Sequence, residues 1–111
     1  MRGSGTVEFG GALVGAVAAQ ITMDNGEKWE FGGGVVGFQI GVGMAYEVSG
    51  DFPGHDHMAG GCTLSIWGAA VGPGNFEVRW GDLQGVIGTV NGKGIGLDIS
   101  AAGGFGVWTK V

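Results

Sequence analysis

The sequence contains little cysteine, proline or charge. Cys62 is its single cysteine, so an intrachain disulfide and a zinc cage built from several cysteines are both excluded. Two prolines and the lack of a repeating Gly-X-Y triplet exclude a collagen-like chain. Charged residues make up 14% of the chain, below the roughly 25% of an average globular protein. Because disordered chains need high charge and few large apolar groups, this composition predicts a folded domain.

Basic residues are especially few. The net charge is −5, and five cations are spread along the chain: Arg2, Lys28, Arg79, Lys93 and Lys110. Five scattered cations cannot form a basic stripe along a phosphate backbone, so the sequence predicts no nucleic-acid binding. Attraction to anionic lipid head groups is not expected, for the same reason.

Glycine, in contrast, is abundant, with 28 residues where average usage near 7% would give roughly eight. Many of these glycines alternate with large apolar residues, which is not the pattern of a flexible linker. Within strands, glycine removes side-chain bulk and lets a sheet coil or bend. The length predicts one glycine-rich domain over residues 1–111. Residues 1–5 are expected to derive from an expression tag or to be disordered, and they lack the apolar core of a secretory signal.

The clearest periodicity lies in residues 36–48. Large apolar side chains occupy every second position there: Val36, Phe38, Ile40, Val42, Met44, Tyr46 and Val48. A period of two predicts a β-strand with all of them on one face. This strand would span roughly 43 Å if straight, too far for a compact domain of this length. We therefore expect a bend at Gly41 or Gly43, and long bent strands favour a small closed barrel.

Further strands and turns follow from the same signals. Strands are predicted at 7–9 and 12–23, kinked at Gly10 and Gly11, and at 28–33, 62–71, 76–80, 86–90, 95–99 and 105–111. Turns are predicted at 24–26, 72–75 and 91–94, and an exposed loop at 50–61. Segment 8–15 recurs as 30–37, which indicates two similar strands side by side in one sheet. The predicted fold class is all-β, a compact closed antiparallel barrel of about eight strands.

No motif in the chain assigns a binding site. Residues 32–37 match Gly-x-Gly-x-x-Gly, but a strand follows them instead of the helix that would hold a pyrophosphate. His55, Asp56 and His57 are the one cluster of metal-capable side chains, which Asp51 or Cys62 could complete. A solvated loop explains the same residues, so we assign no metal and no cofactor.

Catalysis is equally unsupported. No serine lies in a Gly-x-Ser-x-Gly elbow, Cys62 begins a strand, and the ten carboxylates offer no means of choosing a pair. We therefore name no catalytic residue and predict that the protein is not an enzyme. Trp80 shares the parity of Phe76 and Val78, which favours a place in the core. Trp29, Trp67 and Trp108 can serve either in the core or on an exposed aromatic platform.

The C-terminal third resembles the closing strands of the actinobacterial virulence-associated (Vap) proteins. The resemblance is carried by Phe-Glu-Val-Arg-Trp-Gly-Asp at 76–82, Gly-Val-Ile-Gly at 85–88 and Gly-Gly-Phe-Gly-Val-Trp at 103–108. Residues 33–46 are similar to that family's glycine-valine-glycine-aromatic strand, and the match covers about two thirds of the chain. It implies an eight-stranded antiparallel barrel with Greek-key connections. It also implies a secreted, protease-resistant domain that acts in the host phagosome without a recognised active site.

These observations together predict a non-enzymatic, secreted β-barrel whose partner is a host protein or a membrane surface. Two alternatives stay open at this point. One is a small carbohydrate- or ligand-binding barrel, suggested by the four tryptophans and the acidic loop. The other is a membrane-active β-protein that uses the apolar face of residues 36–48. The sequence leaves the oligomeric state undetermined.

Overall fold

The computed structural model describes residues 1–67, 75–93 and 101–111, where the backbone is almost entirely extended. Six strands follow the chain in order: β1 (Arg2–Met23), β2 (Lys28–Asp51), β3 (Gly60–Trp67), β4 (Asn75–Asp82), β5 (Gly85–Lys93) and β6 (Ala101–Lys110). One 3-10 turn, η1 (His55–His57), lies between β2 and β3. Within the described ranges, no helix is long and apolar enough to cross a membrane.

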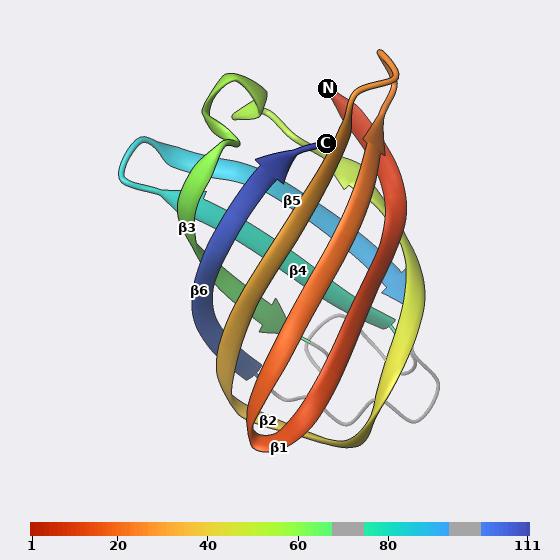
Figure 1. The fold of residues 1–111 in the computed structure, drawn as a ribbon, viewed down its shortest axis with the longest axis vertical. Helices are drawn as coiled ribbons and strands as arrows, with labels where there is room; N and C mark the ends of the chain where they lie inside the picture. Colours follow the sequence, from red (N-terminus) through yellow and green to blue (C-terminus); the bar gives the residue numbers. More distant parts are fainter. Residues whose placement is uncertain (68–74, 94–100) are drawn as a thin grey trace.

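The two longest strands must bend to fit the molecule. β2 has 24 residues, which would span about 79 Å at roughly 3.3 Å each, whereas the longest dimension of the molecule is 33 Å. The β1–β2 hairpin is accordingly folded over on itself (Figure 1). The start of β1, at Gly3 and Gly5, thereby comes to lie beside residues 20–23 of the same strand. The N–H of Asp24 donates to the carbonyl of Arg2 at 3.0 Å.

The folded hairpin lets six strands form an eight-stranded closed antiparallel barrel. The first part of β2 pairs with β6, β6 with β3, β3 with β4, and β4 with β5. β5 then pairs with the last residues of β2, from Val48 to Asp51, and this closes the cylinder. The predicted all-β closed barrel is thus confirmed, while its Greek-key connections stay a prediction.

One bulge overturns the prediction that residues 36–48 share a face. Val36 is 61% exposed, whereas Tyr46 and Val48 are 8% and 5% exposed, so they lie on opposite faces of β2. The cause is visible in the ladder with β1, where Leu13 pairs with Phe38 but Val14 pairs with Val36. Gly37 is the extra residue, and a single inserted residue reverses the inward and outward alternation. The ladder is irregular again opposite Gly10, at the predicted bend of β2.

Several predicted boundaries also change. β5 continues through Asn91 to Lys93, so the turn expected to start at Asn91 is wrong. The loop expected at 50–61 is shorter, and it is not uniformly exposed, because Phe52 and Met58 are fully buried. The predicted strand at 95–99, the end of the strand at 62–71 and residues 72–74 of the predicted turn lie outside the described residues. Residues 2–5 begin β1 and pair with residues 48–51.

Candidate functional site

Aromatic side chains fill the barrel interior. Seven rings contact one another in pairs: Phe9, Phe31, Tyr46, Phe52, Phe76, Trp80 and Trp108. Inside the barrel, the rings of Trp80 and Trp108 lie 5.0 Å apart at 66°, an edge-to-face arrangement. Both side chains are essentially fully buried. Since side chains occupy this space, the outer wall and the loops of the described barrel are the surfaces available for contact with other molecules.

The tryptophans do not form an exposed platform. Trp29 and Trp108 are buried with Trp80, which decides the two alternatives left open for them. Trp67 faces outward from β3 but is partly covered, because the Arg79 guanidinium lies 5.2 Å from its ring centre. Arg79 in turn pairs with Glu77 at 3.0 Å. Phe105 is therefore the most exposed aromatic ring among the described side chains, at 76%.

The polar loop places its metal candidates near the surface. Asp56 and His57 are exposed on η1, and the His57 N–H donates to the Gly54 carbonyl at 2.8 Å. His57 also lines a recess of about 180 Å³ that Asp82 shares. Within the described side chains, no group of three or more potential metal ligands forms. The side chain of His55 lies outside that description, so the assignment of no metal to this loop stays a prediction.

Cys62 is a buried thiol. Desolvation, with a smaller contribution from the charge of Asp82, raises its pKa to about 11. At neutral pH the group is a neutral thiol, which is a poor nucleophile and a poor metal ligand. Its environment agrees with the expectation that it packs as a small apolar side chain.

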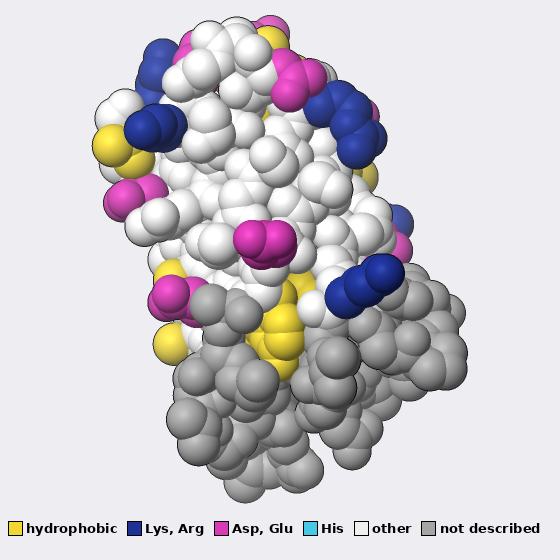
Figure 2. Space-filling model, turned by 90° about the vertical axis from the view of Figure 1, so that its right-hand side faces the viewer, with side chains coloured by type: hydrophobic (Ala, Val, Ile, Leu, Met, Phe, Trp, Pro, Cys, Tyr) yellow, Lys and Arg dark blue, Asp and Glu magenta, His cyan; other side chains and the backbone are white. Residues whose placement is uncertain are grey.

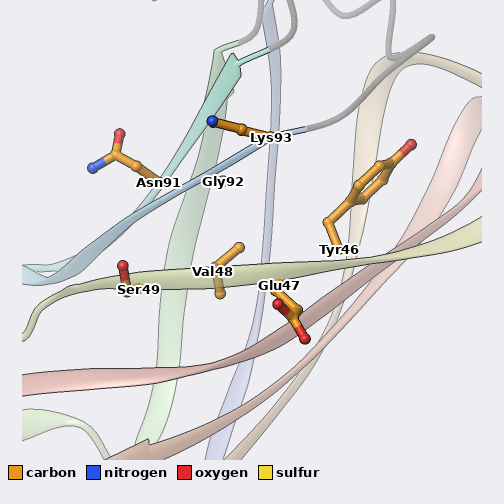
Figure 3. Close-up of a pocket in the computed structure, with 7 residues that line it drawn as sticks. All are labelled: Tyr46, Glu47, Val48, Ser49, Asn91, Gly92 and Lys93. Carbon is orange, nitrogen blue, oxygen red and sulfur yellow. The ribbon is translucent and has the colours of Figure 1, made fainter.

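A groove in the described wall lies where β2 and β5 separate (Figure 3). It has a volume of about 570 Å³, and Tyr46, Glu47, Val48, Ser49, Asn91, Gly92 and Lys93 line it. The carboxylate of Glu47 and the ammonium of Lys93 point in different directions (Figure 3). These seven residues do not direct a nucleophile and a base at a common point, which a catalytic site would require. The lining of the groove is instead polar, as in a binding surface.

A second outer feature is an uncharged face on β1, β2, β6 and β3, at the front of Figure 1. We call it the apolar face, and it comprises Val14, Ala16, Ala18, Gly32, Gly34, Val36, Gly61, Thr63, Ser65, Gly103, Phe105 and Val107. Strand register brings these residues together, since Val14 pairs with Val36 and Phe105 pairs with Gly34. The sequence did not reveal this face, because the bulge at Gly37 determines which residues of β2 point outward.

Charge is dispersed over the remaining surface. On the side formed by β1 and the end of β2, acidic and basic side chains are scattered without a cluster of either sign (Figure 2). Ion pairs are exposed, such as Lys110 with Glu27 at 3.4 Å. This distribution offers no basic patch among the described residues, and the absence of a nucleic-acid partner stays a prediction.

Comparisons with known proteins agree with this architecture. No family model matches the chain, and no curated protein gives a significant match. Among solved structures, the virulence-associated protein VapB from the intracellular pathogen Rhodococcus equi superposes with a TM-score of 0.77, covering 100% of this chain and 98% of that chain. The chain has a Vap-like fold. At 12% identity this likeness shows the fold alone. The resemblance stated from the C-terminal motifs is thus confirmed for the Vap-like barrel.

Proposed function

We propose that this Vap-like barrel is a secreted, non-enzymatic domain that acts through contacts of its outer surface with a host protein or membrane. The filled interior carries this proposal. Trp80 and Trp108 are buried and pack against each other inside the cylinder, where a ligand-binding barrel would hold its ligand. A function that involves other molecules must then use the wall or the loops.

The outer surface is better suited to binding a partner than to catalysing a reaction. Among the described residues, the β2–β5 groove and the apolar face both have room for a partner, and neither brings a nucleophile together with a base. Strands in a closed barrel hold such a surface rigidly, so little conformational entropy is lost on binding. VapB is described as a virulence-associated protein from an intracellular pathogen. That description supports, for this chain, a partner on the host side.

The test is recovery of the purified protein with macrophage phagosomal membranes in a flotation gradient. The membranes are used intact and after protease treatment, with an unrelated filled β-barrel of similar net charge as the control. We expect this chain, and not the control barrel, to float with intact membranes. Loss of binding after protease treatment would identify a host protein, and retention would identify the lipid surface. Failure to float at micromolar protein would refute the proposal.

One observation favours a second candidate function, carbohydrate binding in the β2–β5 groove. Ser49, Asn91 and Lys93 place hydroxyl, amide and ammonium groups along a groove of about 570 Å³, a size that fits small ligands. Calorimetric titration with a panel of glycans tests it, using Asn91→Ala as the variant. Heat of binding that is lost in Asn91→Ala would favour this function over a surface contact elsewhere.

A further inference from the structure

The outward-facing glycines of the barrel are not needed by its own packing. A Cβ atom added at Gly32 would meet nothing within 4 Å, and at Gly34, Gly61 and Gly103 the nearest atoms would be 3.7, 4.0 and 3.8 Å away. Inward-facing glycines differ, because a Cβ at Gly33 would lie 2.7 Å from the Phe105 carbonyl oxygen. Glycine within a strand weakens it unless another backbone or a ligand approaches closely. The outward glycines therefore indicate a close approach from outside.

The same face carries large exposed apolar side chains. Val14, Val36, Phe105 and Val107 are 70%, 61%, 76% and 51% exposed. Phe105 and Val107 form a ridge along β6, while Ala16, Ala18, Gly32 and Gly34 form a low shelf beside it on β1 and β2. A monomeric protein seldom exposes such a continuous apolar patch without a binding role.

We propose that the apolar face binds the apolar face of a second copy, so that the protein forms a weak two-fold dimer. A two-fold axis between β2 and β6 places the ridge of each copy over the shelf of the other. Both the projections and the recesses of such an isologous interface are present on one surface, as this symmetry requires. Face-to-face sheets pack about 10 Å apart through interdigitated side chains, which the ridge and shelf permit.

The buried area fits a weak dimer. The four large side chains expose roughly 430 Å² in one copy, or about 860 Å² in two, and the small residues around them add a few hundred. The total lies near 1,200 Å², the lower end for specific interfaces. The absence of charge from these twelve positions also argues for a self-complementary partner, since none of them demands an opposite charge.

A lipid bilayer is the alternative occupant of the apolar face. A substitution in the shelf distinguishes a bilayer from a second copy of the chain. Added apolar area would strengthen binding to a lipid surface, whereas a second copy of the chain can dock only if the recess stays empty. Gly34→Val fills the shelf and adds an apolar side chain, and the room around Gly34 lets the monomer fold. The two occupants therefore predict opposite effects of this one substitution.

The experiment is sedimentation velocity of the full chain from about 5 to 500 µM, with flotation on phosphatidylcholine vesicles in parallel. We expect reversible dimerisation that Phe105→Ser and Gly34→Val each weaken at least tenfold. Leu83→Ser, on the fully exposed β4–β5 turn, is the matched control and should change it less than twofold. Because each copy carries −5 outside the face, raising salt should strengthen association. Melting temperatures of all variants check that the monomer is folded.

Two results would overturn the dimer. The first is a single monomeric species over the whole concentration range. The second is a Gly34→Val variant that self-associates as well as the parent chain or floats with vesicles better than it, which would assign the face to lipid. The first result leaves the flotation with phagosomal membranes unaffected, and the second favours its lipid outcome, so failure of the dimer and failure of the proposed function remain distinguishable.

Discussion

Two neighbouring glycines of β6, Gly103 and Gly104, should respond in opposite ways to the same substitution. Gly104 faces inward between Val35 and Leu64, whereas Gly103 faces outward between Val36 and Ser65. A Cβ atom at Gly104 would overlap the carbonyl oxygen of Gly34 and would lie 2.8 Å from the Val35 Cα. At Gly103 the nearest atom would be the Leu64 carbonyl oxygen at 3.8 Å, an ordinary contact.

The size of the stability change depends on which atoms must move to make room for the added methyl group. In Gly104→Ala the obstructing atoms belong to the β2 backbone, so β6 must shift away from β2. Overpacking of this kind costs about 1–3 kcal/mol, and loss of one ladder hydrogen bond adds about 1 kcal/mol. We expect a loss of ~2–4 kcal/mol in the free energy of unfolding, or a melting temperature lower by roughly 8–16 °C. Gly103→Ala should instead gain about 0.5–1 kcal/mol, because alanine is less flexible in the unfolded chain.

The assay is urea unfolding of both variants at low micromolar protein, monitored by tryptophan emission and far-ultraviolet circular dichroism. Low concentration keeps any self-association through Gly103 out of the measurement. Equal effects of the two substitutions, or a stable Gly104→Ala variant, would refute the argument that inward glycines let the strands coil closely.

Three further predictions rest on individual side chains. The raised pKa of Cys62 favours the neutral thiol in the folded state, so its stabilising contribution is complete below pH 9 and is lost as pH rises from 9 towards 11. Comparing the unfolding free energy of the parent chain with that of Cys62→Ala over this range isolates the contribution, and identical pH profiles would contradict the prediction. Phe52→Ala removes a fully buried ring and should cost about 3–5 kcal/mol, whereas Leu83→Ala on the exposed turn should stay within about 0.5 kcal/mol; denaturant titration measures both, and similar losses would show that Phe52 is not an anchor. Lys110→Ala breaks a half-exposed pair with Glu27 and should cost less than about 1 kcal/mol, so a larger loss in thermal melts would mean that this pair is part of a stronger network.

The sequence predicted the elements that depend on local signals. Asp24, Asn25 and Gly26 form the expected turn, where Gly26 adopts φ of 89°, and the kink at Gly10 coincides with a register shift. The alternation of Phe76, Val78 and Trp80 correctly placed all three in the core. Each of these features is decided within a few residues, so periodicity and turn chemistry suffice.

Features that depend on pairing between strands could not be predicted. The bulge at Gly37 arises from the register with Leu13 and Val14, and nothing within residues 36–48 indicates it. For the same reason the apolar face was missed, because its residues come from four strands. Phe52 and Met58 looked like loop residues, yet both are fully buried, and the Phe52 ring packs against Trp80 and Trp108. The glycines likewise look alike in sequence, and only the barrel separates those that face inward from those that face outward.

The position of the chain ends has a practical consequence for engineering. The Arg2 carbonyl accepts a hydrogen bond from Asp24, and the Val111 N–H donates to Lys28, so both ends flank the same β1–β2 turn. A short linker from Val111 to Met1, combined with new ends opened between Leu83 and Gln84, would yield a circular permutant with every ladder retained. A reporter fused to Met1 or to Val111 would emerge at one pole of the cylinder and leave its wall accessible (Figure 1).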